Sequence, residues 1–198
     1  MELWIASGNK GKINEFKMLL NDMPLEFHSQ NELKSFSQPP ENGNSFLENA
    51  TIKAKSLKAV KNSNCWVVAE DSGIEVEGLG GLPGIHSARY AGPHASDQEN
   101  VAKLLKMVSI RCSDNRKARF YCSLISINPS GELKEYIGIL NGSISLKAQG
   151  QAGFGYDVCF IPEGESKTLA ELGLAFKNKV SHRSIAIAAF KNELKNSL

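Results

Sequence analysis

The sequence predicts an α/β protein built on a mixed β-sheet. A short apolar run at residues 2–6 leads through a small-residue turn into a helical pattern. A second helical segment precedes another apolar run of the buried-strand type at residues 65–69. From residue 110 to residue 150, strand patterns follow one another directly, as in an antiparallel meander. Strands alternating with helices, followed by a meander, favour a mixed sheet over a purely parallel one.

Composition limits the function classes. The chain has 198 residues, of which 41% are hydrophobic and 22% charged, so we expect one globular domain or two lobes that share a core. A net charge of +2 without a visible basic patch argues against a dedicated nucleic-acid partner. The four cysteines have neither C-x-x-C nor zinc-type spacing, so we expect reduced thiols. Neither a signal peptide nor an 18-residue apolar run is present, so we expect a cytoplasmic protein with no membrane partner.

The first half of the chain divides into recognisable elements. Strand 2–6 and turn 7–11 precede a helix whose apolar positions recur at helical spacing. Residues 21–44 are polar and proline-containing, which predicts a loop with at most one short strand. A helix begins at Ser45, which forms an S-x-x-E capping box with Glu48, and it runs to about residue 60.

In the second half, strand 65–69 is expected to end in "EDSG", with a half-exposed strand at 74–77. The loop at 78–93 holds five glycines and two prolines, and long loops of this kind are often functional. Ser96 and Glu99 form a second capping box, which opens another helix.

The remaining elements belong mainly to the meander. Strands are expected at 118–127, 133–140 and 143–148, with a hairpin turn at Asn141-Gly142. A glycine-rich loop at 150–160 enters a short strand, and Ser181 caps a last helix over 181–190.

The opening turn, "SGNKGK" at 7–12, has the physical features of a phosphate-binding turn. It is not a P-loop, because Ala6 and Ile13 stand where that motif needs glycine and Ser or Thr. Backbone N–H groups at a helix start attract anions, and Lys10 and Lys12 add positive charge. An ordinary solvated turn explains the same residues equally well, so both interpretations stay open.

Acidic residues supply candidate metal ligands. Glu70 and Asp71 follow an apolar strand, where ionised groups lose hydration and repel one another, and a divalent cation would remove that cost. Successive strand residues point to opposite faces, so the two need not bind one ion. A simple Asp-Ser-Gly turn is the alternative. Glu48 has a capping role, whereas Glu41, which precedes the helix, has none. Lys53 follows Glu48 on that helix, and the alternative for Lys53 is an ordinary solvated lysine face.

Two later segments offer groups for a flat ligand. "GFGYD" at 153–157 places two aromatic rings on a flexible backbone, which suits stacking on a base, although such rings also serve as lids over a core. At the start of the last helix, Ser181 is followed by His182 and Arg183, and Lys177 lies just before. Cations are unfavourable at a helix N-terminus, so a bound anion or acceptor would explain them; solvent is the alternative.

The order of these motifs resembles one family. "SGNKGK…E" at 7–15, "ENGNSFLENATIKA" at 41–54, "AEDSGIEVEGLGGLPGIHSARYAG" at 69–92, "GFGYD" and "SHRS" at 181–184 together resemble the inosine triphosphate pyrophosphatase family over nearly the whole chain. The resemblance implies hydrolysis of XTP, ITP and dITP to the monophosphate and pyrophosphate with Mg²⁺. It also implies an elongated α/β protein with a long twisted mixed sheet, two lobes flanking a central cleft, and a homodimer.

The resemblance also implies roles for individual residues. Substrate contacts are implied for the turn residues Ser7, Gly8, Asn9, Lys10, Gly11 and Lys12, for Lys53 and Ser72, and for the base-binding residues Phe154, Gly155, Tyr156, Asp157, Lys177, His182 and Arg183. Glu41 and Asp71 resemble metal ligands, with Glu70 a further contributor, and Asp71 resembles the proton acceptor. The sequence departs from the family pattern at Val158, Leu169 and His86, where proline, phenylalanine and Tyr or Met are usual.

Two rival functions stay open. One is a related diphosphatase for pyrimidine or modified nucleotides, against which "GFGYD" and "SHR" argue. The other is a nucleotide-binding sensor without catalysis, which would need no acidic metal site, whereas this chain has Glu41, Glu70 and Asp71.

Overall fold

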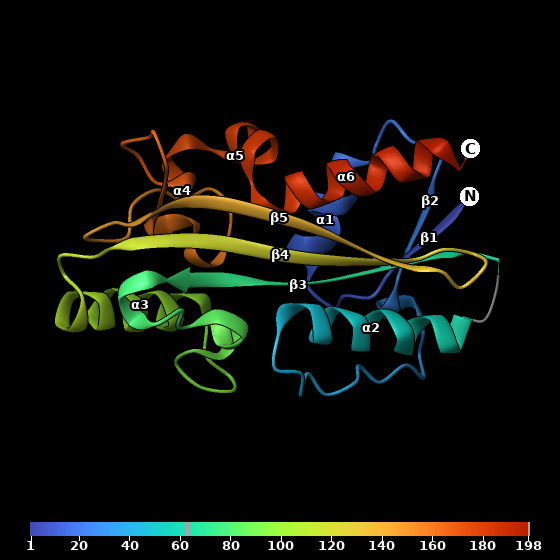
Figure 1. Cartoon of the computed structure of the whole chain (residues 1–198), viewed down its shortest axis with the longest axis horizontal. Coiled ribbons are helices and arrows are strands. Elements are labelled where there is room, and N and C mark those ends of the chain that lie inside the picture. Colours follow the sequence, from blue (N-terminus) through green and yellow to red (C-terminus); the bar gives the residue numbers. More distant parts are fainter. Residues whose placement is uncertain (62–63, 198) are drawn as a thin grey trace. The chain divides into compact units, whose positions relative to one another are not determined.

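The computed structural model describes residues 1–61 and 64–197. Its strands are β1 (Glu2–Ile5), β2 (Glu26–Ser29), β3 (Trp66–Val76), β4 (Lys117–Ile127), β5 (Leu133–Ile144) and β6 (Phe160–Pro162) (Figure 1). Its α-helices are α1 (Lys10–Leu19), α2 (Phe46–Lys61), α3 (Asp97–Arg111), α4 (Leu169–Leu172), α5 (Leu174–Val180) and α6 (His182–Asn196). Short 3₁₀ turns occur at η1 (Gln30–Glu32), η2 (Glu77–Leu79), η3 (Gly84–Arg89) and η4 (Gly155–Cys159).

The six strands form one mixed sheet in the order β2-β1-β3-β4-β5-β6. Strand β1 pairs in parallel with both β2 and β3, whereas β5 and β6 pair antiparallel. The α/β class and the mixed sheet are therefore confirmed.

The chain divides into two compact units. The first comprises Met1–Asp71, Cys122–Ile137 and Ser184–Leu198, and the second comprises Ser72–Tyr121 and Gly138–Arg183. Strands β3, β4 and β5 run without interruption through the boundary, so each strand contributes residues to both units. Each unit has its own buried apolar side chains.

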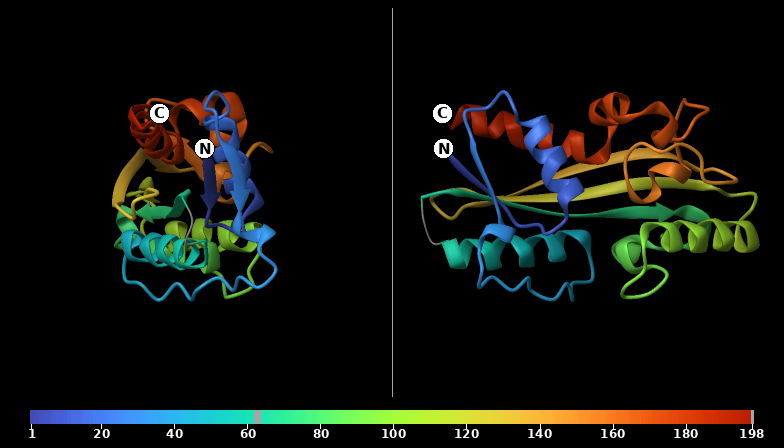
Figure 2. Two further views of the ribbon diagram at one scale, coloured as in Figure 1. Left: turned by 90° about the vertical axis from the view of Figure 1, so that its right-hand side faces the viewer. Right: turned by 180° about the vertical axis from the view of Figure 1, so that it is seen from behind.

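In the first unit both faces of the sheet are covered. Leu3 and Ile5 of β1 face a cluster that includes α1 and α6, whereas Trp4 and Ala6 face the cluster formed with α2. This alternation follows from the two-residue period of a strand. The views show α2 on one side of this part of the sheet and α1 with α6 on the other (Figures 1 and 2).

In the second unit one face of the sheet packs against α3. Val101, Leu104 and Val108 are buried at helical spacing on α3 and contact sheet residues such as Ile74 and Phe120. The helix begins as expected, because Ser96 and Glu99 make both hydrogen bonds of the capping box. At the start of α2 the box is made differently, since the Glu48 carboxylate accepts from the Asn44 N–H at 2.7 Å.

The expectation that a strand ends in "EDSG" is wrong. Strand β3 continues through Glu70, Asp71, Ser72 and Gly73 to Val76. The carboxylates do not interrupt the strand because each is paired with a lysine, at 3.0 Å for Glu70 and 3.1 Å for Asp71.

The hairpin expected at Asn141-Gly142 is also wrong, and so is the strand at 143–148. Strand β5 passes through both residues and ends at Ile144. Gly142 pairs with Pro162 of β6, and a Cβ at position 142 would lie 2.2 Å from the Ile161 carbonyl oxygen. The glycine is therefore needed for the close approach of β5 and β6, and it does not form a turn.

The other expected elements are present within a few residues, including β2 in the polar segment 21–44 and α6 after Ser181. Helices α4 and α5 were not predicted, because each spans less than about two turns and shows little periodicity. The four cysteines form no disulfide. Among the described residues, none of the helices has the length and apolar character needed to cross a bilayer.

Candidate active site

The turn between β1 and α1 forms a helix N-terminus that faces solvent. The Asn9 side chain caps α1 by accepting from the Lys12 N–H at 3.1 Å, and Ser7 Oγ accepts from the Asn9 N–H at 3.2 Å. Gly8, Asn9 and Lys10 are exposed, whereas Ser7 is buried. The predicted phosphate-binding residues 7–12 are thus gathered at the positive end of a ten-residue helix.

Lys12 connects this turn to β3. Its ammonium lies 3.0 Å from the carboxylate of Glu70, which is 2% exposed. The buried Cys122 thiol donates to the same carboxylate at 3.0 Å. Glu70 is therefore held on the face of the sheet that packs against α1, as the alternation along β3 requires.

Asp71 points to the opposite face, toward α2. Its Oδ1 lies 3.1 Å from Lys53 Nζ, and its Oδ2 accepts from Asn49 Nδ2 at 3.2 Å. Lys53 also lies 3.0 Å from Glu41 Oε1, so one ammonium joins the two carboxylates. Gln38 supplies a further donor to Glu41 at 3.2 Å.

The buried environment shifts the pKa values of Asp71 and Lys53. Burial raises the pKa of Asp71, although the charges of Lys53 and Lys12 oppose that shift. Burial alone would lower the pKa of Lys53, but the charges of Asp71 and Glu41 outweigh it, so the pKa of Lys53 is raised. Lys53 therefore stays protonated, and Asp71 is a carboxylate whose proton affinity exceeds that of an exposed aspartate.

Sequence reasoning missed Asn49. This residue has no exposed surface, donates to Asp71, and accepts from the Gly43 N–H through Oδ1 at 2.9 Å. It lies in the motif at 41–54, one turn before Lys53 on the same face of the helix. The i, i+4 spacing to a candidate phosphate ligand was the signal that could have identified it.

The acidic residues fit the ligand chemistry of Mg²⁺. This ion prefers one or two carboxylates completed by phosphate and water. Glu41 and Asp71 supply two carboxylates that already share one cation, Lys53, and the raised pKa of Asp71 reflects a buried anion that a cation would stabilise. Glu70 stands with Lys12 on the other face of β3.

A different group of potential metal ligands lies at the edge of the sheet. Within residues 1–61 and 64–197, the three-residue set whose ligand atoms all lie within 4.8 Å of one another is Glu2, Glu26 and His28. Two of these are exposed, and His28 is already bonded to Glu32 at 2.8 Å and stacked on Trp4. We therefore interpret these three residues as surface groups of β1 and β2 and not as the metal site.

In the second unit, an ion pair supports the aromatic loop. Lys177 Nζ lies 2.6 Å from Asp157 Oδ2, and both side chains are 3% exposed. The same Asp157 oxygen accepts from the Phe154 N–H at 2.9 Å. Lys177 lies 4.2 Å from the centre of the Phe154 ring and Arg183 lies 5.7 Å from it. Phe154 is partly exposed and has two cations close to its ring.

The other residues of this group are largely buried. Arg183 donates to Ser72 Oγ at 3.1 Å, which places Ser72 beside the base-binding candidates. The His182 ring stacks on Phe120 with centroids 4.7 Å apart and planes 8° apart. Tyr156 is buried, and its hydroxyl donates to the Ser87 carbonyl at 2.7 Å. His86 is exposed.

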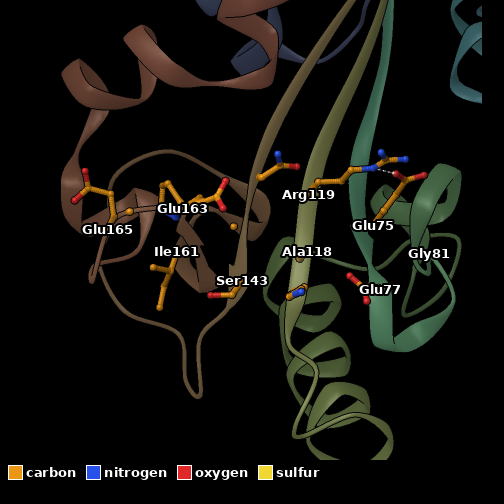
Figure 3. A pocket seen from close by; sticks show the side chains of 14 residues that line it. Glu75, Glu77, Gly81, Ala118, Arg119, Ser143, Ile161, Glu163 and Glu165 are labelled. Atoms are coloured by element: carbon orange, nitrogen blue, oxygen red, sulfur yellow. Dashed lines mark hydrogen bonds and ion pairs between the residues drawn. The ribbon is translucent and has the colours of Figure 1, made fainter.

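The second unit also has a cavity of about 720 Å³ on the face of the sheet away from α3. Figure 3 shows Arg119 and Glu75 paired beside it, with Glu163 and Glu165 on the opposite wall. None of the residues predicted for the site lines it. The predicted residues instead form two groups, one in each unit.

Comparison with known proteins extends this description. The chain matches the Ham1 family over residues 3–193. It is 55% identical over 195 residues to the dITP/XTP pyrophosphatase of Bdellovibrio bacteriovorus, covering 98% of each chain. It is 40% identical over 186 residues to the dITP/XTP pyrophosphatase of Bacillus subtilis, covering 94% of this chain and 93% of the other.

Solved structures agree with this match. A HAM1 protein from Coxiella burnetii superposes with a TM-score of 0.90 at 33% identity, covering 99% of both chains. The Ham1 protein of Staphylococcus aureus superposes with a TM-score of 0.86 at 39% identity, covering 100% of both chains. Sequence and fold therefore lead to one group of proteins.

Proposed function

Because the chain belongs to the Ham1 family, we propose that it is a hydrolase that cleaves nucleoside triphosphates to the monophosphate and pyrophosphate. We propose XTP, ITP and dITP as its substrates, in line with the dITP/XTP pyrophosphatase activity for which its relatives are named. The observation that carries the proposal is the Glu41–Lys53–Asp71 group, in which Lys53 and Asp71 are buried, together with the lysine-bearing N-terminus of α1.

We assign the triphosphate to the first unit. The exposed residues 8–10 at the start of α1 and the ammonium groups of Lys10, Lys12 and Lys53 supply donors and positive charge for phosphate oxygens. Phosphoryl chemistry depends mainly on positioning and charge neutralisation, which these groups provide.

Asp71 is the proposed proton acceptor for the attacking water. Its pKa is raised by burial, which strengthens it as a base, and Asn49 and Lys53 fix both of its oxygens. Glu41 and Asp71 would hold Mg²⁺, and Glu70, which pairs with Lys12 on the other face of β3, would add negative charge near the site without binding the same ion. When bound, the ion would neutralise phosphate charge and make water at the site more acidic. Attack at the α-phosphorus then releases pyrophosphate toward the lysines.

We assign the purine base to the second unit. The partly exposed Phe154 ring provides a stacking surface, and Asp157, Lys177, His182 and Arg183 provide polar groups around it. Donors directed at the 6-keto oxygen would be left unpaired by adenine, which discriminates by about 10⁴–10⁵-fold in sites built this way. Ser72 lies with this group through its contact to Arg183.

We further propose that the working form is a cytoplasmic homodimer. The proposal rests on the family resemblance, and analytical ultracentrifugation of the purified chain tests the dimer directly. A single species at the mass of one 21.6 kDa chain would contradict it.

Product analysis tests the activity. The enzyme is incubated with ITP, XTP, dITP, GTP, ATP and dUTP, with Mg²⁺ and with EDTA. We expect IMP, XMP and dIMP, each with pyrophosphate, from ITP, XTP and dITP, with the activity abolished by EDTA and little product from ATP and GTP. Orthophosphate with a nucleoside diphosphate would move the attack to the γ-phosphorus. Turnover of dUTP alone would favour the pyrimidine diphosphatase, and binding without turnover would favour the sensor.

A further inference from the structure

The base loop, residues 153–157, is held by residues outside the predicted site. Asp97, the first residue of α3, accepts the Gly155 N–H through Oδ2 at 2.8 Å. Gly155 has a φ of +58°, a conformation that favours glycine. A carboxylate acceptor makes this a charge-assisted hydrogen bond, so the loop is fixed at its most permissive residue.

A second contact holds the loop from its buried side. Tyr156 is 7% exposed, and its hydroxyl donates to the Ser87 carbonyl at 2.7 Å. Ser87 is itself tied to β3, because its Oγ accepts from the Ile74 N–H at 2.9 Å. The Ser87 hydroxyl also donates to the Gly84 carbonyl at 2.6 Å. The loop thus connects through η3 to the central sheet.

The first turn of α3 binds η3 as well. Asn100, three residues after Asp97, is 2% exposed. Its Oδ1 accepts from the Ala91 N–H at 2.8 Å and its Nδ2 donates to the Ala88 carbonyl at 3.1 Å. One helix turn therefore anchors both the base loop and the long glycine-rich segment at 78–93.

These contacts decide where Phe154 lies. Phe154 immediately precedes Gly155, and its own N–H is held by Asp157 at 2.9 Å. Of the two residues that follow it, Gly155 is held by Asp97 and Tyr156 is held by the Ser87 carbonyl. When either contact is removed, the loop keeps the other one, the Asp157 hydrogen bond to the Phe154 N–H and the contact of Lys177 with the Phe154 ring, so each contact carries part of the positioning.

We propose that Asp97 and Tyr156 are positioning residues for base recognition, which hold the base loop so that Phe154 stacks on the purine. The proposal rests on the proposed function. It assigns the Tyr156 hydroxyl to the Ser87 carbonyl instead of to substrate, and it gives the long 78–93 loop a role in specificity. Neither residue touches the reacting phosphorus.

The test uses Asp97→Ala, Asp97→Asn and Tyr156→Phe in the full chain. We expect KM for ITP to rise by about threefold to tenfold in Asp97→Ala and Tyr156→Phe, with kcat nearly unchanged and the ITP-to-ATP preference reduced. Asp97→Asn keeps an acceptor oxygen and restores most of the affinity. Inhibition by inorganic triphosphate, which has no base, stays at the wild-type value.

Glu99→Ala is the matched control. Glu99 caps the same turn of α3 through the Ser96 N–H at 2.7 Å and makes none of the loop contacts described above. A KM that stays at the wild-type value in both Asp97→Ala and Tyr156→Phe overturns the proposal. A rise in Glu99→Ala equal to that in Asp97→Ala also overturns it, because general loosening of the helix start would then explain the effect.

Failure of the proposed function is recognised separately. If the wild-type protein releases no pyrophosphate from any purine triphosphate, the function is wrong. The same variants are then titrated with IMP by calorimetry, since binding needs no turnover. Weaker IMP binding in Asp97→Ala and Tyr156→Phe supports the positioning role, and unchanged binding contradicts it.

Discussion

Lys53 Nζ lies 3.1 Å from Asp71 Oδ1, and Lys53 is almost fully buried. The proposed base and its cation therefore form a buried ion pair in the first unit. Lys53→Ala would leave Asp71 and Glu41 without the charge between them. We expect kcat/KM for ITP to fall by about 10²–10³-fold, the range seen when a preorganised charge-stabilising group is removed.

The control for this prediction is Lys55→Ala, because Lys55 is exposed on the same helix. Steady-state pyrophosphate release measures both variants. Equal activity of Lys53→Ala and Lys55→Ala would show that Lys53 does not act on the triphosphate.

Asn49 holds the second oxygen of Asp71. Asn49→Ala removes this donor and also leaves the Gly43 N–H without its acceptor at 2.9 Å. We expect a loss of about 1–3 kcal/mol in the free energy of unfolding, together with reduced turnover, because buried groups lose their partners. Urea denaturation measures the loss, with the exposed Asn44→Ala as control. A stability change no larger than that of the control would show that these two hydrogen bonds of Asn49 do not stabilise the folded chain.

The buried pair Asp157–Lys177 allows a double-mutant cycle. Either single replacement by an apolar residue leaves one charge nearly dehydrated, and we expect each to cost about 3–5 kcal/mol. Replacing both, as in Asp157→Leu with Lys177→Met, leaves no unpaired charge from the pair, so it should cost less than the sum of the two. Chemical denaturation of the four proteins measures the coupling. Simple additivity would mean that the pair is not coupled in the folded state.

Alkaline pH should destabilise the second unit. Burial raises the pKa of Cys159 to about 12, and burial also raises the pKa of Tyr156. An unfolded cysteine ionises near pH 9, so above that pH the unfolded chain loses a proton that the folded chain keeps. The stability contributed by the neutral thiol is complete below pH 9 and is lost as the pH rises toward 12, by up to about 1.4 kcal/mol per pH unit.

The measurement is the urea midpoint at pH 8 and at pH 10. Cys159→Ala should lose less stability over this interval than the wild type, and Cys112→Ala serves as control. If Cys159→Ala loses as much stability as the wild type, the thiol does not contribute to the pH dependence.

Most of the elements could be predicted from local patterns. The capping pair Ser96–Glu99 and the apolar spacing of α3 specify a helix without reference to the rest of the chain. The expected turn in "EDSG" and hairpin at Asn141-Gly142 failed for a common reason. Both rely on residues that favour turns locally, and in both places pairing partners distant in sequence keep the strand continuous.

The sequence by itself determined which residues are proposed for the chemistry, because the lysine-rich turn, the acidic residues and the aromatic loop are recognisable by type and order. The tertiary structure alone decided their partners. Adjacent residues of β3 point to opposite faces, so Glu70 meets Lys12 from α1 whereas Asp71 meets Lys53 and Asn49 from α2. Likewise, the contacts of Asp97 with Gly155 and of Tyr156 with Ser87 join segments 58 and 69 residues apart. Contacts of this kind depend on packing over long distances in the chain, which a local pattern does not encode.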